Sequence, residues 1–118
     1  AETLGYLEFM ALMNAASAVV TDSGGVQEET SVIGVPCVTV RTSTERPVTC
    51  RLGTNTLVDP ADDAAIFAAV RTGCAAARRG ADIPLWDGHA GERVIHALAE
   101  WATTLERGLV PASVGVCT

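Results

Sequence analysis

Three short apolar runs, each followed by a segment with turn or helix signals, constrain the fold of this chain more than any other feature. The runs are residues 18–21, 35–40 and 55–58, and all three contain valine and threonine. Short runs of β-branched residues are typical of buried strands. Strands that alternate with helices pair in parallel through right-handed crossovers. The sequence therefore predicts an α/β fold whose parallel sheet is flanked by helices.

Helical signals lie between and around these runs. From the apolar spacing we expect helices at residues 7–18, 26–33, 63–79 and 89–106. Gly34 and Pro36 are expected to end the second of these helices, and Asp59 or Asp62 to cap the third. In the last helix the side chains expected to face the core are Val94, Ile95, Leu98 and Trp101. The segment 41–53 is polar and is predicted to be a loop.

The composition limits the class of protein. With 118 residues the chain is long enough for one hydrophobic core, and 48% of its residues are apolar. The net charge of −6 argues against nucleic acid or an anionic membrane as the main partner. The sequence shows neither a signal peptide nor an apolar span that could cross a bilayer, so a cytoplasmic location is expected. The chain begins at Ala1 rather than at a methionine, and we expect it to be a fragment.

The cysteines and histidines do not have the spacing of a metal site. The cysteines, which form no C-x-x-C pair, are Cys37, Cys50, Cys74 and Cys117. We expect neither a metal ion nor another cofactor, and we expect Cys37 and Cys74 to be buried free thiols. His89 and His96 are expected at the surface or half-buried. No Ser–His–Asp or Cys–His arrangement is evident.

The stretch "TDSGGVQEET", residues 21–30, follows the first predicted strand. Ligands of open parallel sheets bind beyond the carboxyl ends of the strands. There, Gly24 and Gly25 could take positive φ and let the backbone approach a ligand. The free N–H groups of the following helix favour an anion such as a diphosphate, and Ser23 could add a hydroxyl donor. The alternative is that Asp22 or Ser23 simply caps the helix and the glycines form a tight turn.

Two glutamates follow the glycines. A helix rises about 1.5 Å per residue, so Glu29 stands roughly 6 Å beyond Gly25, which is about the reach from a phosphate to the sugar of the same nucleotide. A carboxylate accepts two hydrogen bonds and suits a ribose cis-diol. We therefore expect Glu29 to bind a ribose and Glu28 to be solvated.

The segment "RTSTERP", residues 41–47, leaves the second predicted strand at the same edge of the sheet. Arg41 and Arg46 are candidates to face a phosphate or a sugar hydroxyl, because a guanidinium offers several donors in one plane. The alternative is that Glu45 and Arg46 form a surface ion pair of little energetic value.

Three motifs point to a known family. DSGG-x-QEE at residues 22–29, R-x-x-TERP with GTN at 41–55, and P-x-x-DG-x-A-x-ER at 84–93 occur in this order. Over residues 4–103 the chain resembles the carboxy-terminal domain of the non-hydrolysing UDP-N-acetylglucosamine 2-epimerases. It departs from their pattern at Val48, where glutamate is usual, and at "PLWDG".

The resemblance implies a fold and a domain organisation. The fold would be a Rossmann-like α/β domain, the carboxy-terminal lobe of the two-lobed GT-B architecture. Residues 1–108 would form this UDP-binding domain, without the amino-terminal lobe, and residues 109–118 would be a tail.

The resemblance also implies a binding site for UDP and UDP-N-acetylglucosamine, formed by Leu4, Phe9, Ser23, Gly24, Gly25, Glu29 and Arg46. The residues 23–25 would hold the diphosphate, and Glu29 the ribose. Phe9 would stack on uracil, although the residues alone favour a core position for it. Leu4 would touch the base through its backbone, and Arg46 would reach the substrate from the second loop.

The implied activity is an isomerase that interconverts UDP-N-acetylglucosamine and UDP-N-acetylmannosamine by eliminating UDP and adding it back. The catalytic carboxylates and histidine of such enzymes lie upstream, so no catalytic residue is expected in this chain, and the chain alone is expected to be inactive. The full-length protein is expected to be a homodimer. Two alternatives stay open: the nucleotide-binding domain of a GT-B glycosyltransferase, and a non-catalytic UDP-binding module.

Overall fold

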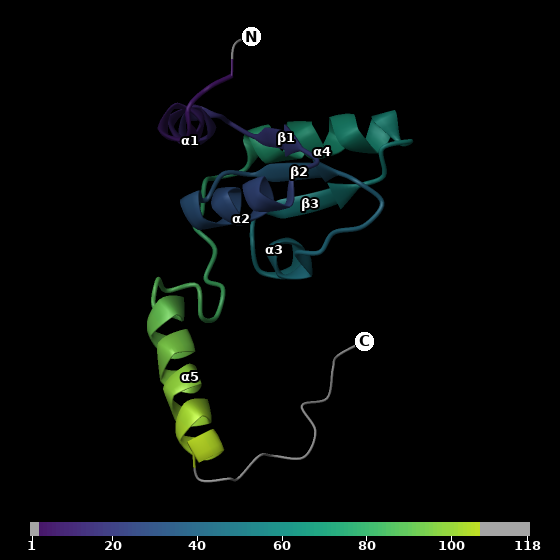
Figure 1. Cartoon of the computed structure of the whole chain (residues 1–118). Coiled ribbons are helices and arrows are strands. Elements are labelled where there is room, and N and C mark those ends of the chain that lie inside the picture. Colours follow the sequence, from purple (N-terminus) through teal and green to yellow (C-terminus); the bar gives the residue numbers. More distant parts are fainter. Residues whose placement is uncertain (1–2, 107–118) are drawn as a thin grey trace. The chain divides into compact units, whose positions relative to one another are not determined.

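The computed structural model of the protein describes residues 3–106, which belong to two compact units divided between Ile83 and Pro84. The first unit contains, in chain order, α1 (Tyr6–Ala15), β1 (Val19–Thr21), α2 (Gly24–Ile33), β2 (Cys37–Val40), α3 (Pro47–Arg51), β3 (Asn55–Val58) and α4 (Asp63–Ala75) (Figure 1). The second unit contains α5 (Ala90–Glu106). The expected tail, residues 109–118, and Cys117 lie outside the described residues.

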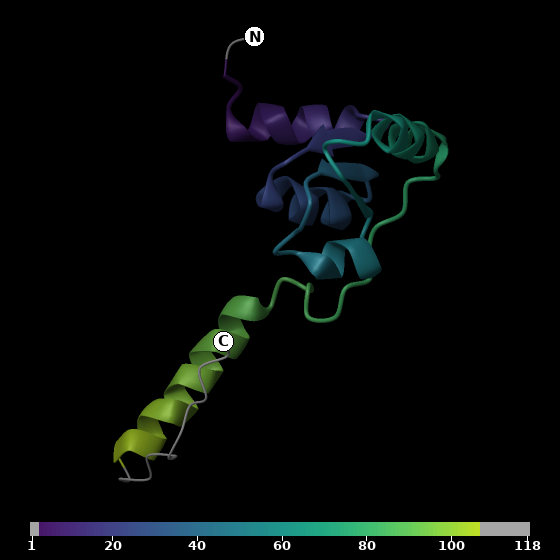
Figure 2. The ribbon, with the colours of Figure 1, turned by 90° about the vertical axis from the view of Figure 1, so that its right-hand side faces the viewer.

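The first unit is built on a parallel sheet with the order β1-β2-β3. Val19, Cys37 and Asn55 are aligned across the three strands. Figure 1 and Figure 2 together show α2 and α4 on opposite faces of the sheet, with α1 towards its β1 side and α3 towards its β3 side. The prediction of an α/β fold with a parallel sheet flanked by helices is confirmed.

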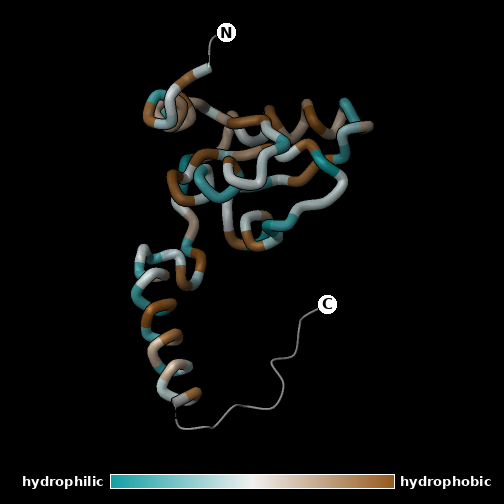
Figure 3. The backbone as a smooth tube through the Cα atoms, viewed as in Figure 1, coloured by the Kyte–Doolittle hydropathy of each residue, from teal (hydrophilic) through white to brown (hydrophobic). Residues whose placement is uncertain are grey.

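The central strand β2 lies in the core of the first unit, and Figure 3 shows apolar stretches along the strands. The buried apolar residues of the described part of the chain are Met13, Val26, Val35, Cys37, Val38, Val58 and Ile83. The buried polar residues are nearly as many: Gln27, Thr30, Ser31, Thr39, Thr49 and Asn55. Cys37 is a buried free thiol as expected, and its burial raises its pKa. The core therefore depends on satisfied hydrogen bonds as well as on apolar contact.

The predicted helix ends are confirmed where a specific side chain or glycine causes them. Gly34 ends α2 in the left-handed conformation, with φ 74°, and its N–H donates to the carbonyl of Thr30. Asp62, rather than Asp59, caps α4, since its carboxylate accepts a hydrogen bond of 2.8 Å from the backbone N–H of Ala65. Asp59 instead accepts a hydrogen bond of 2.8 Å from the backbone N–H of Ala61, two residues further along the chain.

Several expectations were wrong. The segment 41–53 is not entirely a loop, because Pro47 begins the short helix α3. Helix α4 ends at Ala75 instead of residue 79, where the chain turns back and Arg78 donates to the Asn14 carbonyl at 2.6 Å and to its side-chain oxygen at 3.1 Å. Cys74 is exposed, because it lies near this end of α4. Val94, Ile95, Leu98 and Trp101 of α5 are exposed in the second unit taken by itself, and their expected place in a core stays a prediction.

The conformation of Gly34 predicts a loss of stability on substitution. A β-carbon at this position would lie 2.7 Å from the backbone nitrogen of Gly80 and 2.8 Å from the carbonyl carbon of Arg79. Because the left-handed φ is also unfavourable for alanine, Gly34→Ala should lower the free energy of unfolding by about 1–3 kcal/mol. Urea denaturation measures this. The control is Gly91→Ala in α5, where a β-carbon meets no atom within 4 Å. Equal stability of the two variants would contradict the prediction.

Candidate functional site

Two polar segments leave the carboxyl edge of the sheet side by side. One joins β1 to α2, and the other, residues 41–46, joins β2 to α3. The two segments are connected: the Thr44 hydroxyl donates to the side-chain carbonyl of Gln27 at 2.6 Å, and Arg46 forms an ion pair with Glu28. The edge at which parallel α/β sheets bind ligands therefore carries the motif residues of both segments.

The start of α2 is open on its backbone side. Ser23 is the N-cap residue with extended backbone, yet within residues 3–106 no side-chain hydrogen bond caps the helix, so the capping alternative for Asp22 or Ser23 is wrong. The N–H of Ser23 itself donates to the Thr21 hydroxyl at 3.0 Å. A β-carbon built on Gly24 or Gly25 would meet no atom within 4 Å. The first N–H groups of α2 therefore lack a side-chain acceptor and are unobstructed, which is the arrangement that binds anions at helix N-termini.

The glycines do not take the backbone conformation that we expected. Within residues 3–106, the glycines with positive φ are Gly34 and Gly88, so Gly24 and Gly25 have ordinary helical backbone. The prediction of positive φ at this turn was wrong. The fold would accept a β-carbon at either position, because it would meet no atom within 4 Å, so neither glycine is required by contacts within the protein.

The two arginines of the second segment have different partners. Arg41 forms a bidentate pair with Glu45, with hydrogen bonds of 2.9 and 3.1 Å. The pKa of Glu45 is lowered by a backbone hydrogen bond and by this guanidinium. Arg46 pairs with Glu28 instead, its Nε lying 2.6 Å from a carboxylate oxygen. The alternative Glu45–Arg46 ion pair is wrong, because Arg46 pairs with Glu28. The Glu28 side chain is 41% exposed, so it is partly solvated as expected, but the ion pair was not predicted.

The remaining residues of the predicted site lie on α2 and near α1. Glu29 is half-buried, one helical turn beyond Gly25, and its carboxylate makes no hydrogen bond or ion pair within the described residues. Phe9 lies on α1 and is 36% exposed, so it is not a core residue; Leu4 precedes α1 and is 48% exposed. Helix α1 packs against α2. The geometry thus joins the start of α2 with Arg46, while the roles of Leu4, Phe9 and Glu29 stay predictions.

Sequence reasoning missed a buried polar network beneath these segments. Gln27 is fully buried, and its side-chain oxygen accepts hydrogen bonds from Thr44 and from the Asn55 amide at 3.1 Å. A signal was present, because Gln27 lies beside Val26 in the first turns of a helix that packs on the sheet. A polar amide at such a position needs buried partners.

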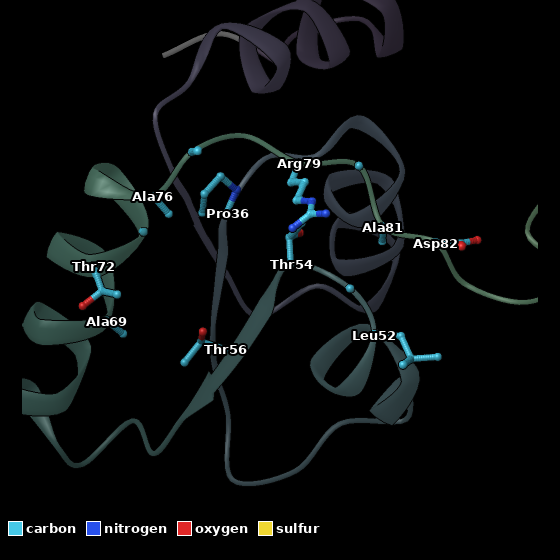
Figure 4. Close-up of a pocket in the computed structure, with 14 residues that line it drawn as sticks. Pro36, Leu52, Thr54, Thr56, Ala69, Thr72, Ala76, Arg79, Ala81 and Asp82 are labelled. Carbon is cyan, nitrogen blue, oxygen red and sulfur yellow. The ribbon is translucent and has the colours of Figure 1, made fainter.

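A separate cavity of about 660 Å³ lies at the opposite edge of the sheet. Pro36 and Thr54, which precede β2 and β3, line it together with Thr72 of α4 and with Arg79. Figure 4 shows these side chains around it, with Asp82 pointing away. None of the predicted site residues lines this cavity, so the cavity and the predicted chemistry do not coincide.

The motif P-x-x-DG-x-A-x-ER organises the start of α5 in the second unit. Asp87 accepts two hydrogen bonds from Arg93, one of 2.9 Å, and another of 3.0 Å from the backbone N–H of His89. The guanidinium and this N–H hold the pKa of Asp87 well below its usual range. His89 and His96 are exposed, as expected, and each faces a glutamate of the same helix.

The described part of the chain offers neither a metal site nor a membrane-spanning helix. Among residues 3–106, no group of three histidine, cysteine, aspartate or glutamate side chains could hold a metal ion. Within the same range, none of the helices has the length and apolar character needed to cross a membrane.

Comparison with known proteins agrees with the motifs at the carboxyl edge. The family model of UDP-N-acetylglucosamine 2-epimerase matches residues 1–99. The chain belongs to the UDP-N-acetylglucosamine 2-epimerase family. The enzyme of that name from Methanocaldococcus jannaschii is 41% identical over 97 residues, covering 82% of this chain and 26% of the relative. The one from Yersinia pestis is 38% identical over 105 residues, covering 85% and 28%.

A solved structure extends the match to three dimensions. The M. jannaschii UDP-GlcNAc 2-epimerase in complex with UDP-GlcNAc and UDP superposes with a TM-score of 0.75 at 40% identity, covering 85% of this chain and 27% of that one. The parallel sheet with flanking helices is thus part of the GT-B-type fold of the family. The chain spans about a quarter of the length of these relatives.

The open start of α2 generates a prediction about stability. Because a β-carbon at Gly25 meets no protein atom and the backbone is helical, Gly25→Ala should leave the free energy of unfolding unchanged or raise it by up to about 1 kcal/mol. Urea denaturation beside Gly53→Ala checks this, since a β-carbon at Gly53 would lie 2.5 Å from the carbonyl oxygen of Thr49. A clear loss of stability in Gly25→Ala would show that the glycine serves the fold itself.

Proposed function

We propose that this chain is the UDP-binding part of a UDP-N-acetylglucosamine 2-epimerase, an isomerase that interconverts UDP-N-acetylglucosamine and UDP-N-acetylmannosamine. The observation that carries the proposal is the start of α2, where, in the part of the chain that the structure describes, no side-chain hydrogen bond caps the helix and two successive residues, Gly24 and Gly25, lack a β-carbon. The family membership and the related structure with UDP-GlcNAc and UDP support it.

The proposed binding residues lie at the start of α2 and on the segments around it. The segment 23–25 binds the diphosphate through the N–H groups of Gly24 and Gly25 and the Ser23 hydroxyl, since the Ser23 N–H donates to Thr21. Glu29, one turn further, accepts hydrogen bonds from the ribose. On α1, Phe9 stacks on the uracil and Leu4 contacts the base through its backbone. Arg46 reaches the substrate from the second segment, where Glu28 already holds its guanidinium near the helix start.

In the reaction, UDP leaves C1 as C2 loses its proton, which gives a 2-acetamidoglucal. The UDP stays bound and adds back to C1 as C2 regains a proton with inverted configuration. A preorganised set of N–H donors stabilises the negative charge that develops on the departing diphosphate. The same donors keep UDP oriented for the return step. The proton transfer at C2 needs groups outside this chain. The whole protein acts as a homodimer in the cytoplasm, without nucleic acid or membrane as a partner.

A second candidate concerns the sugar. The UDP-2,3-diacetamido-2,3-dideoxy-D-glucuronate 2-epimerase of Pseudomonas aeruginosa is 48% identical to this chain over 64 residues. Both enzyme names describe 2-epimerisation of a UDP-linked acetamido sugar, so they share the UDP moiety and differ in the sugar substituents. The residues proposed here contact UDP and are compatible with either sugar, and the assay of activity decides between them.

The first test is the reaction itself. The full-length protein incubated with UDP-N-acetylglucosamine and no acceptor should form UDP-N-acetylmannosamine, which NMR or chromatography detects; the diacetamido glucuronate substrate is assayed in parallel. The isolated chain should give no turnover with either, because the groups for proton transfer are missing. Transfer of the sugar to an acceptor without isomerisation would favour a glycosyltransferase. Turnover by the isolated chain would refute the division of roles.

The second test concerns the proposed diphosphate cradle, residues 23–25 at the start of α2. In the full-length protein, Gly25→Val should weaken UDP binding by about tenfold to a hundredfold, because its side chain fills the space in front of N–H donors that bind a charged group. Glu29→Ala should weaken binding of UDP but not of pyrophosphate. Titration calorimetry with both ligands measures this, and Gly91→Ala serves as the unaffected control. Unchanged UDP affinity in Gly25→Val and Glu29→Ala would remove the basis of the proposal.

A further inference from the structure

A network of buried side-chain hydrogen bonds links the cradle helix to the segment that carries Arg46. Gln27 lies on α2, two residues beyond Gly25, and is fully buried. Its side-chain oxygen accepts from the Thr44 hydroxyl at 2.6 Å and from the Asn55 amide at 3.1 Å. One buried oxygen therefore connects α2, the second segment and the start of β3.

The other ends of this network hold the backbone of Arg46 on both sides. The N–H of Arg46 donates to the Thr44 hydroxyl oxygen at 3.0 Å, and its carbonyl accepts from the Thr49 hydroxyl at 2.7 Å. Thr49 in turn accepts from the Asn55 amide at 3.1 Å. The N–H of Arg46 is thus connected to the Gln27 side chain through the Thr44 hydroxyl. Its carbonyl is connected to the Asn55 side chain through the Thr49 hydroxyl. The side chain of Arg46 is held from outside by Glu28.

The network does not serve stability alone, because within residues 3–106 it contains a buried donor without a partner. The Gln27 side-chain nitrogen is buried and has no hydrogen-bond partner among the described residues. Such a donor costs on the order of 1–3 kcal/mol, whereas apolar side chains of similar shape could fill the same space at little cost. What apolar side chains could not do is fix the direction of the Arg46 peptide, because packing contacts lack the directionality of hydrogen bonds.

We infer that Gln27 and Thr44 are positioning residues, which act through Arg46 by fixing its main chain relative to the start of α2. The inference rests on the proposed function, in which Arg46 and the cradle bind the same nucleotide sugar. If the segment that carries Arg46 were flexible, binding of the ligand would have to order it, and the entropy lost in doing so would lower the affinity for the ligand. A peptide held on both sides keeps that cost low before the ligand arrives.

The test is a double-mutant cycle in the full-length protein. Thr44→Val removes the hydroxyl at nearly constant volume in a half-buried segment, and Thr44→Ser keeps the hydroxyl. Each is made alone and together with Arg46→Ala. Gln27→Met is likewise made alone and together with Arg46→Ala, which gives a second double-mutant cycle. Calorimetry gives the dissociation constant of UDP, steady-state assays give kcat and KM for UDP-N-acetylglucosamine, and thermal denaturation shows that each variant is folded.

The expected result is coupling. Thr44→Val and Gln27→Met should each lower kcat/KM or the affinity for UDP by roughly tenfold when Arg46 is present. In the Arg46→Ala background the same changes should lower them by less than about twofold. Thr44→Ser should restore most of the loss. Thr30→Val is the matched control, because Thr30 is buried on the same helix and its hydroxyl donates to the helix carbonyls of Val26 and Gln27 and to neither Thr44 nor Asn55. It should show no coupling to Arg46.

Three results would overturn the inference. Equal effects of Thr44→Val in both backgrounds would mean that the residue acts independently of Arg46. A failure of Thr44→Ser to restore function would mean that the hydroxyl is not the relevant group. Arg46→Ala without effect on either constant would leave nothing to position. If the wild-type protein bound no UDP and showed no turnover, the proposed function would fail instead, so the two failures are distinguishable.

Discussion

The central strand β2 is the constraint on which the rest of the structure depends. It pairs with β1 on one edge and with β3 on the other, and Cys37, Val38 and Thr39 are fully buried between the layers. Because all three strands run in the same direction, the segments that follow β1 and β2 leave the sheet at the same edge. The proximity of the glycine pair and Arg46 is therefore a property of the topology.

Hydrogen bonds then convert this proximity into a defined arrangement. Thr39, in the central strand, donates to the Asn55 side-chain oxygen at 2.6 Å, and the Asn55 amide bonds Gln27 and Thr49. The network begins in the middle of the sheet and ends at the backbone of Arg46. A small domain with few large apolar residues in its core thus obtains rigidity at its functional edge from polar contacts, which are directional where apolar packing is not.

The sequence predicted those features that depend on local chemistry. The β-branched runs located all three strands, and Gly34 and Asp62 marked helix ends, because backbone conformation and capping are decided within a few residues. The helix α3 was missed, because five residues are too few to show a helical period. The pairing of Glu28 with Arg46 was also missed, since an ion pair across 18 residues of chain depends on how two segments meet in space.

The glycine pair was predicted for a partly wrong reason. The expected positive φ is absent at Gly24 and Gly25, and an ordinary helix runs through them. Sequence alone cannot separate a glycine that the backbone needs from one whose missing side chain matters, because both appear as the same letter. The coordinates separate them: Gly34 and Gly53 have neighbours that exclude a β-carbon, and Gly24 and Gly25 have none.

An anion site made of main-chain amides recognises charge and shape but not the identity of the group attached to the phosphate. Discrimination among nucleotide sugars therefore has to come from side chains beyond the helix start. The same α2 beginning can serve enzymes with different sugars, in keeping with the similarity of this chain to a relative named for a diacetamido glucuronate. If the start of α2 binds the diphosphate as proposed, specificity for a new sugar arises through residues elsewhere, while the proposed diphosphate site is retained.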